Sequence, residues 1–216
     1  MIPVAQSIDD NPTLQAMKQF TIAVPHLEMI AIVMRDNIDD EDIPWPFVGL
    51  GRFYEGHTNY QEAEIWRKDC LSVCKQRFGE ENHDVDQSMK NLALLYKSQG
   101  KYEAAEPLVV DALAMDKKLL WEEHSSVASS MNNLAGLYYS QGKYEEAELL
   151  YVDALAMRKK LLGDEHPDVA SSMNNLAALY DSQGKYEAAE PLLVDALAWG
   201  HEYLKALSDD EKSQMW

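Results

Sequence analysis

Apolar residues recur along this chain with the spacing of an α-helix and are interrupted by short polar turns. In the segment 129–140 they occupy positions i, i+3, i+4 and i+7, which lie on one side of a helix. These residues are Met131, Leu134, Ala135 and Tyr138. A second stripe follows the turn SQGK and contains Ala147, Tyr151, Ala154, Leu155, Leu161 and Leu162. The pattern predicts two helices joined by a tight turn, in which Gly142 adopts the left-handed conformation that ends the first helix.

This two-helix pattern recurs every 42 residues. Residues 129–156 and 171–198 are identical at 23 of 28 positions, and residues 87–114 follow the same pattern. A fainter copy occupies residues 45–72. Units this short cannot each bury a core of their own, so they must stack and cover one another's apolar faces. The sequence therefore predicts an all-α chain of stacked helix pairs.

The repeat divides the whole chain into segments. We expect a capping segment with a degenerate half-repeat at 1–44, a degenerate first repeat at 45–86, three further repeats at 87–128, 129–170 and 171–204, and a C-terminal cap or tail at 205–216. Within the first segment, residues 20–36 predict a helix, followed by an acidic loop from Ile38 to Ile43. The last long helix is expected to end near Leu204, and Ser208 with Glu211 predicts a capping box for a short closing helix.

Three of the units contain the residues of a known repeat. The residues Leu-Ala-x-x-Tyr, Gly-x-Tyr-x-x-Ala and Ala-Leu follow one another at 92–113, 134–155 and 176–197. They resemble the tetratricopeptide repeat, and a period longer than that family's usual length of roughly 34 residues is similar to the kinesin light chain repeats and to related bacterial arrays. The resemblance covers about residues 45–204 and implies a right-handed superhelical solenoid of antiparallel helix pairs. The first unit departs from the pattern, because Gly51 replaces an alanine and Thr58 takes the place of the turn glycine.

The composition and charge of the chain exclude several classes of protein and of binding partner. The chain has 19 basic and 37 acidic residues, a formal charge of −18, which repels phosphate backbones and anionic headgroups. We therefore expect no nucleic-acid binding and no membrane binding. Its 46% hydrophobic content excludes a disordered acidic tail, and no apolar run approaches the roughly 20 residues that span a bilayer. The start MIPVAQSIDD lacks the basic region of a secretory signal, and two cysteines make no disulfide framework, so we expect a soluble, cytoplasmic protein.

Side chains that could catalyse a reaction or bind a metal are scattered along the chain. His124 and His166 occupy equivalent loops of successive repeats, and stacked helices lie about 8–10 Å apart, so the two cannot share one metal ion. Cys70 takes the place of a buried alanine of the other repeats, whereas Cys74 aligns with charged residues and is expected to be more exposed. We expect a non-catalytic protein with no metal site and no cofactor.

The resemblance to tetratricopeptide repeats implies where a ligand would bind. In that family an extended peptide lies in a concave groove lined by the first helices of the repeats. The groove positions expected to contact it are Arg52, Lys90, Asn91, Lys97, Asn132, Asn133, Tyr139, Asn174 and Asn175. Asparagine amides have both a donor and an acceptor and suit a ligand backbone. For Asn91, Asn133 and Asn175 the alternative is that the side chain joins adjacent helices.

Charge along these groove positions differs from that of the whole chain. Three of the groove positions, Arg52, Lys90 and Lys97, are basic, and we call them the basic patch. Two other groove positions, Glu55 and Asp181, are acidic. Kinesin light chain repeats receive aromatic–acidic cargo peptides in a basic groove, and the resemblance implies a weaker version here. A chaperone-type carboxylate clamp would be incomplete, because an apolar and two neutral residues stand where an asparagine and cations are needed.

Trp121 replaces the loop glycine present as Gly79 and Gly163. Two interpretations are open: the ring packs over a neighbouring helix end, which Leu119 and Leu120 favour, or it offers a contact site for a partner.

The sequence as a whole predicts a protein–protein interaction scaffold that binds an extended peptide or partner segment in its groove. The alternative is a regulatory or sensing segment of a larger signalling protein. We expect a monomer or a weak homo-oligomer that associates through its terminal helices.

Overall fold

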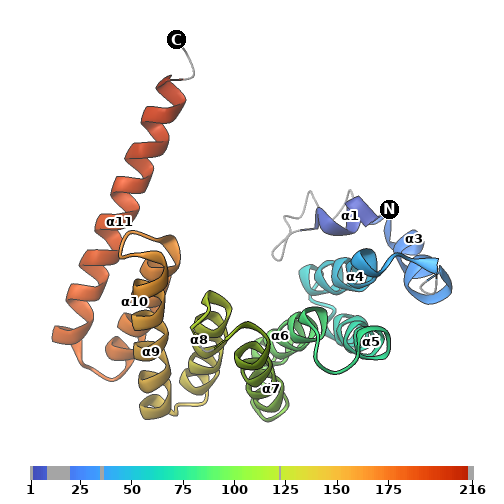
Figure 1. Ribbon diagram of the computed structural model, residues 1–216, viewed down its shortest axis with the longest axis horizontal. Helices are drawn as coiled ribbons and strands as arrows, with labels where there is room; N and C mark the ends of the chain where they lie inside the picture. Colours follow the sequence, from blue (N-terminus) through green and yellow to red (C-terminus); the bar gives the residue numbers. More distant parts are fainter. Residues whose placement is uncertain (1, 9–19, 35–36, 122, 214–216) are drawn as a thin grey trace. The chain divides into compact units, whose positions relative to one another are not determined.

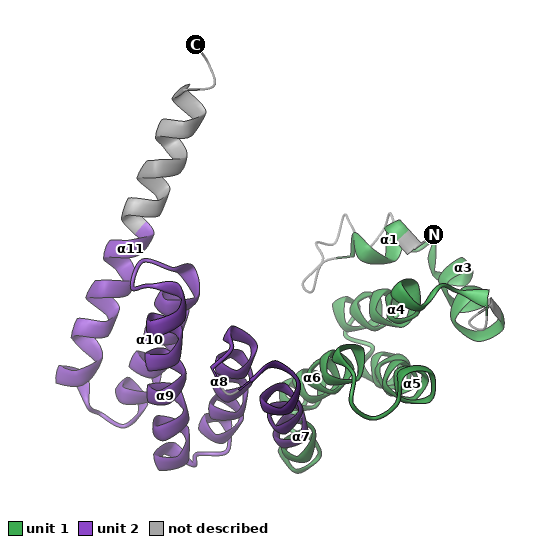
Figure 2. Ribbon diagram, viewed as in Figure 1, with its two compact units in different colours: residues 1–108 green, residues 109–216 purple. Residues whose placement is uncertain are grey.

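The computed structural model describes residues 2–8, 20–34, 37–121 and 123–213 (Figure 1). Every regular element among these residues is a helix, which confirms the predicted all-α class. None of the described helices is long and apolar enough to cross a membrane. The chain divides into two compact units, Met1–Leu108 and Val109–Trp216, whose boundary lies within one helix (Figure 2).

The helices follow the predicted order. The first unit contains α1 (Ile2–Gln6), α3 (Val24–Met29), the π-helix η1 (Ile30–Met34), the 3₁₀-helix η3 (Asp40–Asp42), α4 (Pro44–Gly56), α5 (Tyr60–Phe78), α6 (His83–Ser98) and the start of α7 (Tyr102–Leu120). The second unit contains the rest of α7, α8 (Ser125–Ser140), α9 (Tyr144–Leu162), α10 (Pro167–Ser182) and α11 (Tyr186–Ser213). Within the units, α4 pairs with α5, α8 with α9 and α10 with α11, while α5 also packs on α6 and α9 on α10.

The two ends differ from their predictions. The helix expected at 20–36 is present over 24–34, in two geometries, and the acidic loop after it contains η3. The five-residue α1 was not predicted. The separate closing helix from Ser208 was predicted wrongly, because α11 continues to Ser213. The sequence from His201 to Ser213 contains neither glycine nor proline and consists largely of good helix formers, so nothing in it interrupts the helix.

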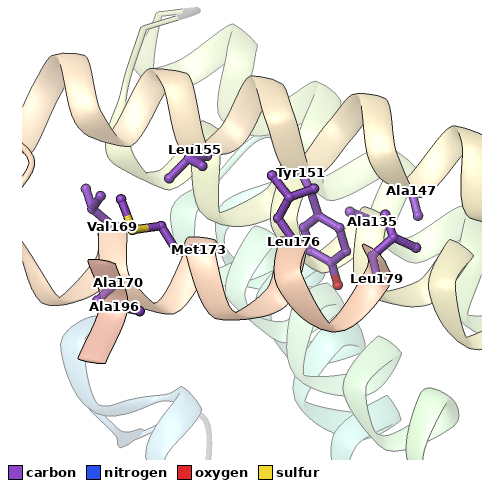
Figure 3. Close-up of a cluster of buried hydrophobic side chains, with 10 residues drawn as sticks. All are labelled: Ala135, Ala147, Tyr151, Leu155, Val169, Ala170, Met173, Leu176, Leu179 and Ala196. Atoms are coloured by element: carbon purple, nitrogen blue, oxygen red, sulfur yellow. The ribbon is translucent and has the colours of Figure 1, made fainter. Parts of the chain in front are cut away.

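The core of the second unit lies between successive helix pairs (Figure 3). Tyr151 and Leu155 of α9 pack against Val169, Met173 and Leu176 of α10. Small residues accompany them at Ala135, Ala147, Ala170 and Ala196. All of these side chains are buried, so the apolar stripes identified in the sequence are the faces on which the helices stack.

The turns within the repeats share one backbone conformation. Gly100, Gly142 and Gly184 have φ of 70°, 75° and 73°, and the residue after each donates its N–H to a tyrosine carbonyl five residues back. These are the left-handed position and the long bond of a Schellman motif. Thr58 has φ 56°, and Asn59 N–H donates to Tyr54 O at 2.9 Å. The degenerate first repeat therefore forms the same turn without its glycine.

The lysine that follows the turn glycine links neighbouring repeats. Lys101 Nζ lies 2.7 Å from Glu64 of α5 and 5.6 Å from the centre of the Tyr96 ring. Lys185 repeats the arrangement with Glu148 at 2.7 Å and Tyr180 at 5.3 Å. The lysine of the recurring Gly-Lys sequence thus has the same structural role at these two turns.

We predict that Thr58→Gly raises the free energy of unfolding by about 0.5–1 kcal/mol. A left-handed conformation costs a β-branched residue roughly 1–2 kcal/mol, and glycine removes this cost. The greater flexibility of glycine in the unfolded chain offsets part of the resulting gain in stability. Urea unfolding with and without the substitution measures the difference. The reciprocal Gly100→Thr should lower stability by a similar or larger amount, and equal stabilities for all three proteins would contradict the prediction.

We predict that Glu64→Gln weakens the dependence of stability on acidic pH. Hydrogen bonds from Lys101 and then Lys68 lower the pKa of Glu64 from 4.5 to about 2. The carboxylate therefore stabilises the fold above pH 4.5, and this contribution is lost as the pH falls from 4.5 towards 2. Because both lysines are about half exposed, the effect should be roughly 0.5–1 kcal/mol. Thermal unfolding at pH 3 and pH 6 should show a smaller difference for the variant than for the wild type.

Candidate functional site

In the second unit, hydrogen bonds join the first helices of successive repeats. Asn175 Nδ2 of α10 donates to Asn132 Oδ1 of α8 at 3.2 Å, and the Tyr139 hydroxyl lies 2.8 Å from Ser182 Oγ. Each bond links residues 43 apart, one more than the period. We call this line of polar side chains on α8 and α10 the α8–α10 seam and define it by Ser129, Asn132, Tyr139, Asn175 and Ser182.

The seam retains hydrogen-bonding capacity after these internal bonds are made. Asn132 uses its carbonyl oxygen and keeps its amide hydrogens, whereas Asn175 donates and keeps its carbonyl oxygen. Asn133 and Asn174, beside them on the same helices, are exposed. Of the two interpretations of Asn175, the helix-joining one is observed, and it leaves one amide donor and one acceptor next to each other.

In the first unit, the expected basic patch is largely engaged. Lys90 Nζ forms an ion pair with the buried Asp86 at 2.6 Å. Lys97 is half-buried, and burial lowers its pKa. Asn91 accepts a hydrogen bond at 3.3 Å from Gln87 on its own helix. The positive charge expected along α6 is therefore partly neutralised within the protein.

The groove positions of the first repeat are covered by the N-terminal helix. Arg52 Nη1 of α4 donates to the backbone oxygen of Ile8 at 2.9 Å, and Ala5 and Ile8 are buried. A Cβ on Gly49 would lie 2.9 Å from the Cβ of Ala5. Gly49 stands where the other repeats have an asparagine, so a missing side chain is the sequence signal that could have revealed α1 against α4.

A second glycine of α4, Gly51, is also explained by a side chain that leaves no space for a Cβ. A Cβ on Gly51 would lie 2.8 Å from Nε of Arg67, which is buried and pairs with Glu55 at 2.8 Å. Gly51 replaces the alanine of the other repeats because this arginine fills the space. Glu55, expected to be an acidic groove residue, is the partner of that arginine.

One repeat position of the second helices is buried and polar, contrary to expectation. Cys74 was predicted to be more exposed, but its exposed fraction is 0%. Cys74, Asp116 and Arg158 occupy equivalent places, and each bonds the serine fourteen residues further on, at 3.6, 2.6 and 2.8 Å. The three serines are Ser88, Ser130 and Ser172. A hydroxyl that both donates and accepts can bind a thiol, a carboxylate or a guanidinium, which explains why these residue types are tolerated there.

Trp121 does not pack over a helix end, so the favoured interpretation was wrong. Its exposed fraction is 83%, and Leu119 beside it is also exposed. Trp121 has φ 73°, close to the 84° of Gly79 and the 82° of Gly163. The loop conformation requires a left-handed residue here, and the indole extends from that residue into solvent.

The loop histidines have a structural role. His124 and His166 each accept a hydrogen bond at 3.1 Å through Nδ1 from the backbone N–H two residues later, at the start of α8 and α10. Asn82 does the same for α6 through its side-chain oxygen. Among the described residues, no three His, Cys, Asp or Glu side chains are grouped closely enough to hold a metal ion.

Comparisons with known proteins agree with the arrangement of helix pairs. A family model for the tetratricopeptide repeat matches residues 42–118 and 124–198. BtubC (BKLC) from P. vanneervenii is 26% identical, with 88% of this chain and 73% of that chain covered and a TM-score of 0.69. A putative kinesin light chain of Podospora anserina with nearly identical TPR-like repeats is 24% identical, with 94% of each chain covered and a TM-score of 0.75. The expected resemblance to kinesin-light-chain-like repeats is confirmed.

A more distant solved structure has the same fold. YrrB, described as a TPR protein with an unusual peptide-binding site, is 16% identical over 97% of this chain and 96% of its own, with a TM-score of 0.54. A comparison with curated proteins gives no match.

We predict that Gly49→Asn, which restores the asparagine of the other repeats, detaches α1 from α4. The new Cβ would overlap Ala5, so backbone hydrogen exchange in residues 5–8 should accelerate about tenfold or more, while exchange in α4 itself should not. Gly200→Ala is a suitable control, because its added Cβ meets nothing within 4 Å. Unchanged protection of residues 5–8 would contradict the contact.

Proposed function

The chain belongs to the tetratricopeptide repeat family, and we propose that it is a non-catalytic protein that holds a peptide, or an extended segment of a partner protein, against the first helices of its repeats. Stacked repeats of this kind present extended surfaces for other proteins. In the second unit the ligand contacts the α8–α10 seam and the adjacent Asn133 and Asn174. In the first unit the ligand contacts Lys90, Asn91 and Lys97.

The observation that supports this function best is the amide pair of Asn132 and Asn175. Its remaining hydrogens and oxygen match the carbonyl oxygen and the N–H of a peptide bond, so it suits a backbone without requiring a particular side chain. Ser129 and Tyr139 are ten residues apart on α8, and a helix rises about 1.5 Å per residue, so the seam extends roughly 15 Å. Four to five residues of extended chain, at about 3.3 Å each, would cover that length.

Arg52 has a smaller part in this proposal than the other expected groove residues. Its bond to Ile8 and the burial of its neighbours leave little room for a ligand at the first repeat. Regulation of an attached signalling domain by the repeats remains the alternative prediction. A cytoplasmic location, association through the terminal helices and the absence of nucleic-acid and membrane binding also remain predictions.

The test is a titration with an acidic, tryptophan-containing peptide at low and moderate salt. We predict that Asn132→Ala with Asn175→Ala weakens binding about 5- to 150-fold, since each of the two lost hydrogen bonds costs roughly 0.5–1.5 kcal/mol. Leu149→Ala is the control, because that side chain is exposed on α9 and belongs to no first helix. No binding by the wild type at either salt concentration, or equal binding by both variants, would contradict the proposal.

A further inference from the structure

One side of α11 has the stacking surface of a repeat, but no described helix covers it. On α9 the corresponding residues, Tyr151 and Leu155, are buried by α10. Their equivalents Leu193 and Leu197 are 42% and 72% exposed. On its other side α11 packs against α10, where Ala196 is buried (Figure 2). α11 therefore presents to solvent an apolar surface of the kind that α9 buries.

A glutamate on the same side of α11 lacks the partner that its repeat equivalents have. Glu64 of α5 and Glu148 of α9 each form an ion pair at 2.7 Å with the lysine that follows the turn glycine of the next first helix. These lysines are Lys101 and Lys185. Glu190 stands one period after Glu148 and is exposed, and its carboxylate makes no ion pair with another described residue. The surface thus has both the apolar and the charged part of a stacking contact.

A glycine on this side of α11 distinguishes the surface from the junctions between the repeats of this chain. Cys74, Asp116 and Arg158 occupy one repeat position, and each bonds a serine of the following first helix. The equivalent residue of α11 is Gly200, which has no side chain that could bond a serine. A Cβ at Gly200 would meet nothing within 4 Å, so the space beside it is open. A helix that packs here can place a larger apolar side chain in the position of the serine.

A second copy of this chain does not offer a matching surface. The first helices α6 and α10 already pack on α5 and α9. α4 packs against α1 and α3, and Asn59 stands after its turn where the other repeats have a lysine. Pairing of two α11 helices would bring two acidic surfaces together, because Glu187, Glu190 and Asp195 are exposed and residues 186–198 contain no lysine or arginine. The charge of α11 therefore favours a partner that carries a basic residue.

We propose that Glu190, Leu193, Leu197 and Gly200, which we call the α11 face, bind an amphipathic helix of a partner protein that carries a lysine in the turn after its last residue. This helix lies on α11 as α10 lies on α9. Its apolar side covers the two leucines, and its lysine pairs with Glu190. The α11 face lies on a second helix and is separate from the α8–α10 seam, so this inference does not rest on the proposed function.

The probe for the test is a synthetic peptide of residues 166–186, which contains the α10 sequence and the lysine that already cover α9. The wild-type chain should bind it, and its backbone amide NMR signals should shift in residues 186–198. Leu197→Asp should weaken binding about tenfold or more, since an unpaired charge would then be buried under the helix. Leu149→Asp is the matched control, because Leu149 is 69% exposed on α9, and it should bind the peptide as the wild type does.

Two changes in the peptide test the charge and the open space separately. A peptide with Lys185→Glu should bind the wild type a few-fold more weakly and regain affinity for the Glu190→Lys chain. A peptide with Ser172→Leu should bind about threefold more tightly or better, because the space beside Gly200 accepts the larger apolar side chain.

Absence of peptide binding, or equal weakening by Leu197→Asp and Leu149→Asp, would overturn the proposal. Sedimentation equilibrium of the chain alone gives a further test. A dimer that Leu197→Asp dissociates would also overturn the proposal, because a second copy would then occupy the α11 face. Each of these results would leave peptide binding at the α8–α10 seam untouched.

Discussion

Each helix pair of this chain has an apolar face that only the following pair can cover. Tyr151 and Leu155 of α9 are buried because α10 packs on them. Their repeat equivalents on α11, Leu193 and Leu197, are 42% and 72% exposed. Burying one large apolar side chain is worth roughly 1.5–3 kcal/mol, and a lone helix pair has few other sources of stability. Stacking between neighbours is therefore the main source of stability for each helix pair.

Much of the fold could be predicted because it repeats. The spacing of the alanines and leucines identified the stacking faces, and the turn glycines identified where the first helices end. The turn at Thr58 shows that stacking can impose a left-handed residue even where the side chain disfavours it. The N-terminal helix α1 was not predicted, because five residues are too few to show a helical period. The sequence signal that indicates it within the repeats is Gly49, which has no side chain where α1 packs on α4.

The candidate site was less predictable, because its chemistry depends on pairs of residues. In the alignment of repeats Cys74 is equivalent to two charged residues, which predicted that this position is exposed to solvent. In the structure Cys74 is buried and is hydrogen-bonded by Ser88 of the next helix. Lys90 was expected to contribute charge to a groove, and the buried Asp86 on its own helix neutralises it. The spacing of four residues between Asp86 and Lys90 on one helix could have revealed their pairing, whereas the pairing of Cys74 with Ser88 joins two helices and depends on how they stack.

The serine that α6, α8 and α10 share at one repeat position has a consequence for how such a protein can diversify. Its hydroxyl donates to the thiol of Cys74 and to the carboxylate of Asp116, and it accepts from the guanidinium of Arg158. The partner fourteen residues before the serine can therefore change its sign of charge and still be hydrogen-bonded. The electrostatic character of each junction can thus be altered by one substitution at a time. Successive repeats can thus differ in the charge that they bury between their helices while the hydrogen bond of the serine is kept.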